Sequence, residues 1–297
     1  MTAMTPSLLP PLPDEGVERV LCIVAHPDDM EYGASAAVAA WTAAGIEVSY
    51  LLLTRGEAGM AEDPATVGPL RETEQRRACA RVRVSDLRYL DHPDGMLEGG
   101  LALRRDIARV VRQVRPELIL TANFEVEAYG GLNQADHRVA GLAAIDAARD
   151  AANPWVFREL RESEGLEPWK ASQLMIAGHP SPTHAKSVDE EQVQAAVDSL
   201  HAHEAYLAHV TDHPRPEEFI PDILRSGERP PAARTRWCCG SSASEPHRLG
   251  PGAAVAADPA TAARPRAPTS RSRNIAGPHS ALLGWAGQAP PSRKESS

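Results

Sequence analysis

Residues 20–31 read VLCIVAHPDDME, and this stretch decides the fold. Its first five residues form an unbroken apolar run, which is typical of a β-strand buried on both faces of a parallel sheet. An Ala-rich helix is expected after it over 31–45, with Gly45 as its stop signal, followed by a second strand over 48–54. Strand, helix and strand in this order form a βαβ unit, whose two strands are parallel.

The same alternation continues along the chain. The sequence predicts helices over 70–83, 101–114, 138–148 and 188–207, and strands over 87–90, 118–121 and 173–177. Repeated alternation of this kind indicates an α/β fold, a Rossmann-like open, mostly parallel sheet with helices on both faces. The first strand is not followed by a Gly-rich phosphate loop, which argues against a nucleotide-binding domain.

The composition divides the chain into three parts. Residues 1–17 are rich in Pro and carry acids, and we expect a flexible N-terminal segment there. Residues 18–224 hold the α/β pattern and are expected to form one domain. From 225 to 297 Pro, Ala, Arg, Ser and Gly dominate, and such a composition cannot bury enough apolar surface to offset the entropy of ordering. A disordered low-complexity tail is predicted; a shifted reading frame is the alternative explanation, which resequencing the gene would test.

The distribution of charge and of apolar residues excludes several classes of protein. The net charge is -9, but the residues from Glu228 onward carry ten Lys and Arg against four acids, so the body before them is strongly acidic. An acidic body argues against nucleic acid as a partner. No run approaches the ~18–20 apolar residues of a membrane helix, and the N-terminus lacks a secretory signal. We therefore expect no membrane span and a cytoplasmic location.

Polar residues gather where the first strand ends, at the edge where parallel sheets bind ligands. His26 and Asp29 are three residues apart across a turn, which lets both side chains face one point. A histidine with neighbouring acids is a ligand set suited to zinc. Asp28 would then lie beside the metal and could take a proton from its bound water. The alternative is that Asp28 and Asp29 merely cap the helix.

A second polar stretch, Asn133-Gln134-Ala135-Asp136-His137, follows the fourth predicted strand. Parallel strands place it on the same edge as the first stretch. A catalytic zinc has three protein ligands and an open fourth position, and His26, Asp29 and His137 would supply that set. The alternative for this loop is a capping Asp136 and a solvent-facing His137.

These motifs together resemble a known family. Ala-His-Pro-Asp-Asp-Met-Glu-Tyr-Gly after a buried strand, with Asp-His-Arg-Val-Ala-Gly downstream, is similar to the LmbE-like family, also called the PIG-L deacetylase family. The resemblance covers about residues 18–215, including the motifs at 71–74, 92–95 and 202–204. It implies a Rossmann-like sheet and a zinc-dependent N-deacetylase or amidase that acts on N-acetylglucosaminyl compounds or related thiol conjugates.

The resemblance also implies roles for single residues. His26, Asp29 and His137 match the family's zinc ligands, and Asp28 matches its general base. Glu31 lies nearby, where it would support the ligands rather than bind the metal.

Three further positions follow from the resemblance. Arg71 and Asp94 match positions at which family members contact the sugar, whereas the role of His203 in the late motif is left open. The chain departs from the family at Gln134, where many members have a histidine that stabilises the oxyanion or protonates the leaving amine. A glutamine can donate a hydrogen bond but no proton near neutral pH, so Asp28 would act first as base and then as acid.

The sequence therefore predicts a zinc-dependent hydrolase that N-deacetylates an N-acetylglucosaminyl-type small molecule. Two alternatives stay open: an amidase of mycothiol-type thiol conjugates, and a catalytically impaired zinc-binding member of the family. The expected partner is a small N-acylated sugar or thiol conjugate. The oligomeric state is left open, a homo-oligomer included.

Overall fold

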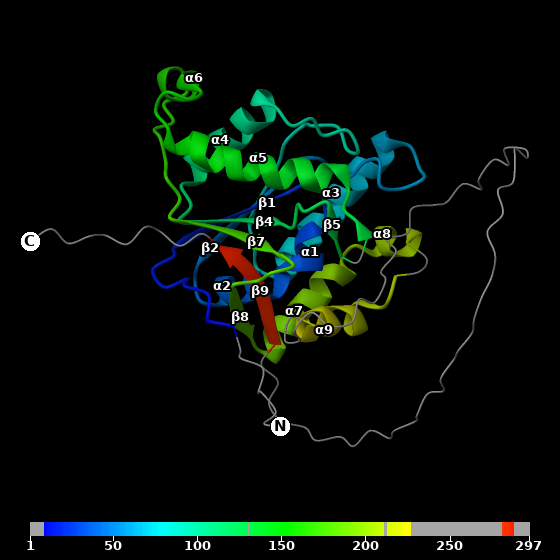
Figure 1. Ribbon diagram of the computed structural model, residues 1–297. Helices are drawn as coiled ribbons and strands as arrows, with labels where there is room; N and C mark the ends of the chain where they lie inside the picture. The colour runs from blue at the N-terminus through cyan, green and yellow to red at the C-terminus, as the bar shows by residue number, and fades with distance from the viewer. Residues whose placement is uncertain (1–8, 130, 211–212, 227–280, 288–297) are drawn as a thin grey trace, which may run out of the picture.

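The fold is an open sheet with helices on both faces (Figure 1). The computed structural model describes residues 9–129, 131–210, 213–226 and 281–287. The strand order of the main sheet is β3-β2-β1-β4-β7-β9-β8. Five of these strands run parallel to one another: β1 (Arg19–Val24), β2 (Glu47–Leu52), β3 (Asp86–Tyr89), β4 (Leu118–Ala122) and β7 (Gln173–Ala177). The predicted Rossmann-like, mostly parallel sheet is confirmed.

Two further strands extend this sheet beyond β7, and the one next to β7 runs antiparallel to both of its neighbours. They are β8 (His184–Val188) and β9 (Ala281–Gly287), and β9 pairs with both β7 and β8. A separate two-stranded hairpin, β5 (Glu127–Ala128) with β6 (Gly131–Leu132), lies in the connection after β4.

The helices form a layer on each face of the sheet (Figure 1). One layer contains α4 (Leu101–Val114) and α5 (Ala135–Ala152), with the short α6 (Arg158–Glu162) after them. The other layer contains α2, α7 and α9, and α3 packs against α7. The bounds of the remaining helices are α1 Asp29–Gly33, α2 Ser35–Ala43, α3 Pro64–Arg81, α7 Glu190–His201, α8 Glu204–His209 and α9 Pro216–Ser226.

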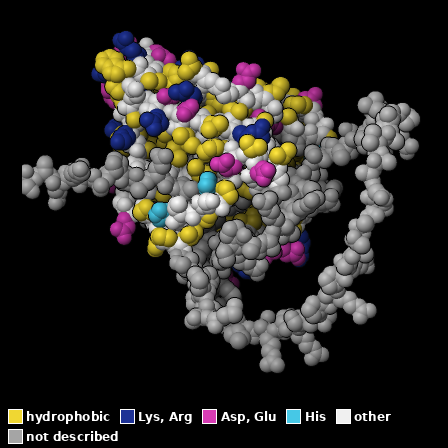
Figure 2. All heavy atoms as spheres, viewed as in Figure 1, with side chains coloured by type: hydrophobic (Ala, Val, Ile, Leu, Met, Phe, Trp, Pro, Cys, Tyr) yellow, Lys and Arg dark blue, Asp and Glu magenta, His cyan; other side chains and the backbone are white. Residues whose placement is uncertain are grey.

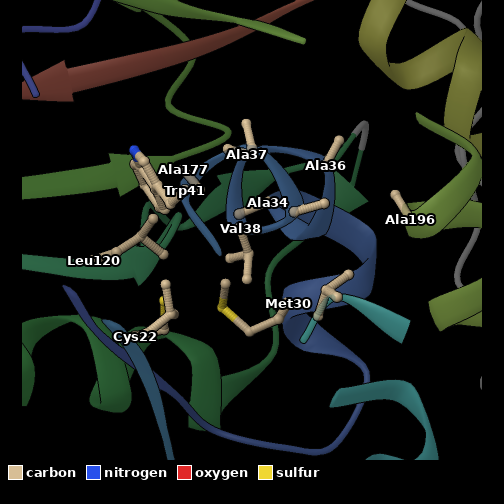
Figure 3. Packing of buried hydrophobic residues seen from close by; sticks show 14 of the residues in the cluster. Cys22, Met30, Ala34, Ala36, Ala37, Val38, Trp41, Leu120, Ala177 and Ala196 are labelled. Atoms are coloured by element: carbon tan, nitrogen blue, oxygen red, sulfur yellow. The ribbon is translucent and has the colours of Figure 1, made fainter. Parts of the chain in front are cut away.

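Alternate residues of the strands enter two separate cores, because successive side chains of a strand point to opposite faces. In β1, Cys22 and Val24 join the core under α2 and α7, and Leu21 and Ile23 join the core under α4 and α5. Figure 3 shows the first of these cores, in which Trp41 of α2 lies among side chains of β1, β4 and β7. The unbroken apolar run of β1 is explained by this double burial.

The chain direction across the sheet reverses between β1 and β4. From β1 the chain proceeds outward to β2 and β3, then returns so that β4 pairs with the free side of β1. Open α/β sheets bind their ligands at such a switch point, outside the carboxyl ends of the strands. The residues after β1 and after β4 are therefore placed together at the expected binding edge.

Three predicted helices differ from those observed. The helix expected over 31–45 is two helices, which meet at Ala34, where φ is -147°. The helix expected over 70–83 begins at Pro64, because the Asp63 side chain accepts a hydrogen bond from the Ala65 N–H and Pro fits the first turn of a helix. The helix expected over 188–207 is interrupted between α7 and α8.

The two ends of the predicted domain also carry structure. Residues 9–17, expected to be flexible, contact the folded part through Leu12 and Val17, which are buried, and through Asp14, which accepts a hydrogen bond from the Trp41 indole. β9 lies within the segment expected to be disordered, most of which is outside the described residues. The limits at 18 and 224 stay a prediction.

On the face shown in Figure 2, basic side chains are interspersed with acidic ones. Among the described helices, none is both long enough and apolar enough to cross a membrane. Cys22 and Cys79 are buried free thiols, as core residues would be, whereas Cys238 and Cys239 lie outside the described residues.

Candidate metal centre and active site

A tight turn after β1 brings the first two predicted ligands together. His26 follows β1 by two residues, and Asp29 is the first residue of α1. The backbone N–H of His26 donates a hydrogen bond to Oδ2 of Asp29, 2.9 Å away. Asp28 completes the turn with φ of +76°, a left-handed backbone that non-glycine residues rarely adopt. The turn thus holds both side chains at the carboxyl end of β1.

The third predicted ligand, His137, lies in the first turn of α5. Its Nδ1 is 2.9 Å from Oδ1 of Asn133. Asn133 is buried and donates through Nδ2 to the carbonyl oxygens of Asn123 (2.8 Å) and Glu125 (3.1 Å). Because Oδ1 of Asn133 is the acceptor, Nδ1 of His137 carries the proton. Nε2 of His137 is then the atom left to bind a metal.

The three predicted ligands converge on one point. Nε2 of His137 is 3.0 Å from Asp29 Oδ1 and 3.2 Å from Nδ1 of His26, and this Nδ1 is 3.7 Å from Asp29 Oδ2. Zinc bonds of 2.0–2.1 Å in tetrahedral geometry place ligand atoms roughly 3.3 Å apart. The donors form a group that could hold a metal ion, and both their types and their spacing fit zinc.

The electrostatics of the site favour a bound cation. Burial would raise the pKa of Asp29, but the charges and hydrogen bonds of His137 and His26 outweigh burial and hold that pKa far below its usual value. Burial would likewise lower the pKa of His26, yet hydrogen bonds to Asp136, Asp29 and Asp94 raise it. These carboxylates surround one histidine, and a metal ion would balance their charge.

The predicted base, Asp28, is buried beside this set of donors. Its backbone N–H donates to Oε1 of Gln75 at 2.8 Å, and Nη2 of Arg71 donates to its Oδ2 at 2.6 Å. Burial raises the pKa of Asp28 to about 6, although the positive charge of Arg71 acts in the opposite direction. A carboxyl group with such a pKa can both accept and return a proton near neutral pH.

Arg71 and Asp94, predicted as sugar contacts, are both buried within the protein. The guanidinium of Arg71 donates to the carbonyl oxygen of Pro27 at 2.9 Å and stacks 4.0 Å from the ring centre of Tyr206. Asp94 lies 2.9 Å from His26 and accepts from the N–H of Ala58 at 2.8 Å. Their role as sugar contacts stays a prediction.

Gln134 lies at the rim of the site. It is exposed, immediately precedes α5, and its side chain forms no capping hydrogen bond with the helix. Its predicted role at the oxyanion stays a prediction.

Glu31 and His203 form a buried pair beneath the site. Glu31 accepts hydrogen bonds from Ser199 Oγ at 2.9 Å and from Gln75 Nε2 at 3.3 Å, and its Oε2 is 3.6 Å from Nε2 of His203. Glu31 thus contacts the turn of Asp28 through Gln75, and its expected role in supporting the ligands stays a prediction.

The sequence did not predict a positioning role for three residues that contact the predicted ligands or the predicted base. Asn133 and Asp136 stand inside the quoted second motif, where their polar side chains next to His137 were the available signal. Gln75 lies in the middle of a charged helix, and nothing in the local pattern distinguishes it from a solvated residue.

Comparisons with known proteins show which family and which proteins the chain is similar to. Residues 21–148 match the family PIG-L: GlcNAc-PI de-N-acetylase. A diacetylchitobiose deacetylase from Thermococcus kodakarensis is 33% identical over 159 residues, which are 52% of this chain and 58% of the relative. A 1D-myo-inositol 2-acetamido-2-deoxy-alpha-D-glucopyranoside deacetylase from Thermomonospora curvata is 29% identical over 198 residues, which are 57% of this chain and 63% of the relative.

A solved structure confirms the fold. The N,N'-diacetylchitobiose deacetylase from Pyrococcus horikoshii superposes with a TM-score of 0.65 and 20% identity, over 72% of this chain and 79% of that one. The chain spans less than two thirds of the length of the two curated relatives, so their activities are not transferred with the fold. The family match confirms the resemblance seen in the sequence: residues 21–148 match the PIG-L (LmbE-like) family, and the solved structure shares the fold.

Proposed function

We propose that this protein is a zinc-dependent hydrolase that removes the acyl group from the amide nitrogen of an N-acetylglucosaminyl-type small molecule. The observation that carries the proposal is the convergence of His26, Asp29 and His137 on one point, next to a buried carboxyl group, Asp28, with a pKa of about 6. The relatives support the substrate class, because those reported above are deacetylases of N-acetylated sugar compounds.

The chain's own residues account for the proton transfers of such a reaction. A zinc ion held by the three ligands would supply Lewis-acid activation of water and of the acyl oxygen. Asp28 takes the proton of the attacking water and then gives it to the leaving amine, since its pKa near 6 permits both. Arg71 holds the Asp28 carboxylate in place, and the exposed Gln134 amide donates a hydrogen bond to the acyl oxygen.

The test is amine release by the zinc-loaded protein from a panel of N-acetylglucosaminides and thiol conjugates. Asp28→Asn is expected to keep its zinc but to lose at least about 100-fold in kcat, the usual contribution of a general acid–base group. The matched control is Asp91→Asn, the same change at a side chain that is 89% exposed, and it should leave kcat unchanged. Undiminished turnover by Asp28→Asn would remove Asp28 from this role.

Gln134 is the one residue that favours a catalytically impaired protein as a second candidate. Gln134→His restores a proton donor at an exposed position, where the larger ring meets little steric hindrance. An impaired protein would bind zinc, release no amine from any member of the panel, and gain turnover with this substitution. Release by the unmodified protein would show that the glutamine suffices; preference for thiol conjugates would favour the amidase.

A further inference from the structure

The His26 ring has acidic groups on both of its sides. Nδ1 faces Asp29 and His137, as described above. Nε2 points the other way and lies 2.9 Å from Oδ1 of Asp94 and 3.4 Å from Oδ2 of Asp136. Because only one ring nitrogen can face the metal, the second can donate its N–H to a hydrogen-bond partner.

Asp94 is fixed by the protein at both carboxylate oxygens. Oδ1 contacts His26, and Oδ2 accepts from the N–H of Ala58 at 2.8 Å. Its backbone N–H donates to Oε1 of Glu57 at 2.9 Å, and the residue is 8% exposed. A carboxylate engaged in this way is held in one orientation, and a sugar hydroxyl would have to compete with these partners.

Asp136, in the first turn of α5, is fixed in the same manner. Oδ2 accepts from the N–H of Gly95 at 2.7 Å, and Oδ1 accepts from the N–H of Leu97 at 3.2 Å. The residue is 3% exposed. Together the two carboxylates tie His26 to the loop that follows β3.

We propose that Asp94, assisted by Asp136, is a positioning residue for the metal centre: it accepts the Nε2–H of His26 and so presents Nδ1 to the metal. The inference rests on the proposed zinc-dependent function, and it adds a positioning role to the sugar-contact role expected for Asp94, which stays a prediction. A carboxylate on the far nitrogen of a metal-binding histidine fixes the tautomer and the ring orientation and raises the basicity of the ligand.

The first measurement is the zinc dissociation constant, by chelator competition, for the unmodified protein and for Asp94→Asn, Asp136→Asn and Asp91→Asn. Loss of an outer partner of this kind weakens metal binding by about 10- to 100-fold, and we expect that loss for Asp94→Asn. Asp136→Asn should lose less, because its contact with His26 is longer at 3.4 Å. Asp91→Asn, three residues from Asp94 and exposed, should not change the constant.

A second measurement needs no variant. Nitrogen-15 NMR of the histidine rings in the zinc-loaded protein should show His26 with its proton on Nε2 and its metal bond at Nδ1. A metal bond at Nε2 overturns the proposal even if Asp94→Asn does not fold.

The outcomes separate the inference from the proposed function. Unchanged zinc affinity in folded Asp94→Asn overturns the positioning role. If that variant then has a raised KM, contact with the sugar is the role that remains for Asp94. Failure of the unmodified protein to bind zinc would instead refute the metal-dependent function itself.

Discussion

At the scale of single residues, the site depends on a strained turn. Asp28 has a left-handed backbone, which costs a non-glycine residue about 1–3 kcal/mol unless its surroundings impose it. Here Gln75 accepts the hydrogen bond of its N–H, and Arg71 binds the preceding carbonyl oxygen as well as its side chain. Two residues of α3 therefore hold the predicted base in its orientation.

This arrangement makes Gln75 important for turnover. Gln75→Leu removes the acceptor of the Asp28 N–H and leaves Glu31 without one of its donors. Because small errors in position cost up to about 100-fold in rate, we expect kcat to fall by about 10- to 100-fold. Zinc affinity should be nearly unchanged, since Gln75 has no hydrogen bond with a predicted ligand side chain among its described contacts.

Steady-state kinetics with a parallel zinc titration checks this prediction. Gln194→Leu, the same substitution at an exposed position on α7, is the control. If Gln75→Leu loses zinc but keeps its kcat with excess zinc, α3 supports the metal centre rather than the base.

Single residues were predicted from the sequence only where a motif contained them. The predicted ligands His26, Asp29 and His137 were singled out because each follows a strand that ends at the same edge. The meeting of His26 with Asp94 could not be read from the sequence, because the two are brought together by the loop geometry after β3, which has no periodic signal.

At the scale of elements, the strand and helix alternation was predicted well and the element ends less well. Apolar runs predicted β1, β2 and β4, because burial on both faces leaves a clear pattern, and shorter segments predicted β3 and β7. The hairpin β5–β6 has two residues in each strand, too few for any pattern to appear. The early start of α3 did have a signal, an Asp followed by Pro at 63 and 64, which capping rules explain.

Packing of α5 against the end of β4 leads to a prediction of stability. A Cβ at Gly141 would lie 2.5 Å from Cβ of Phe124, an atom that cannot move without the backbone. Such overpacking costs about 1–3 kcal/mol, against a gain of up to about 1 kcal/mol from the better helix propensity of Ala. Gly141→Ala should therefore lower the free energy of unfolding.

Urea denaturation measures this effect. Gly99→Ala is the matched control, because its new Cβ would have only an ordinary contact, at 3.8 Å from Val139. A Gly141→Ala variant more stable than the unmodified protein would mean that Phe124 can move aside.

The edge strand β3 is held to β2 partly by a titratable group. Burial would raise the pKa of Asp86, but hydrogen bonds from Arg88 and Ser49 outweigh burial and lower it. A lowered pKa in the folded state means that Asp86 stabilises the fold above its unfolded pKa of 3.8, and that this contribution disappears as the pH falls through the folded pKa. The contribution is no more than about 1 kcal/mol, because the pair is partly exposed and screened.

Thermal unfolding of Asp86→Asn should therefore show a lower Tm than the unmodified protein at pH 7 and an equal Tm near pH 2. Asp91→Asn, with its exposed side chain, serves as the control. A difference in Tm that persists unchanged at low pH would show that the hydrogen bonds matter and the charge does not.

At the scale of the whole molecule, the topology creates a concentration of negative charge. The chain adds strands on one side of β1 up to β3 and then returns to the other side with β4. The acids after β1, after β3 and at the start of α5 therefore all lie around His26. Like charges at such short distances repel one another, and a cation between them offsets that repulsion. A cation bound at this site would therefore stabilise the fold as well as take part in the chemistry.

Zinc should accordingly stabilise the entire domain. A ligand at about 100 times its dissociation constant adds about 2.7 kcal/mol to the free energy of unfolding when it binds only the folded state. For a domain of about 150–250 residues this corresponds to a rise in Tm of roughly 5–10 °C. Calorimetry of the metal-stripped protein with and without zinc should show that rise, and His137→Ala and Asp29→Asn should abolish it while Asp91→Asn retains it. Equal Tm values with and without zinc would contradict a metal centre at this edge of the sheet.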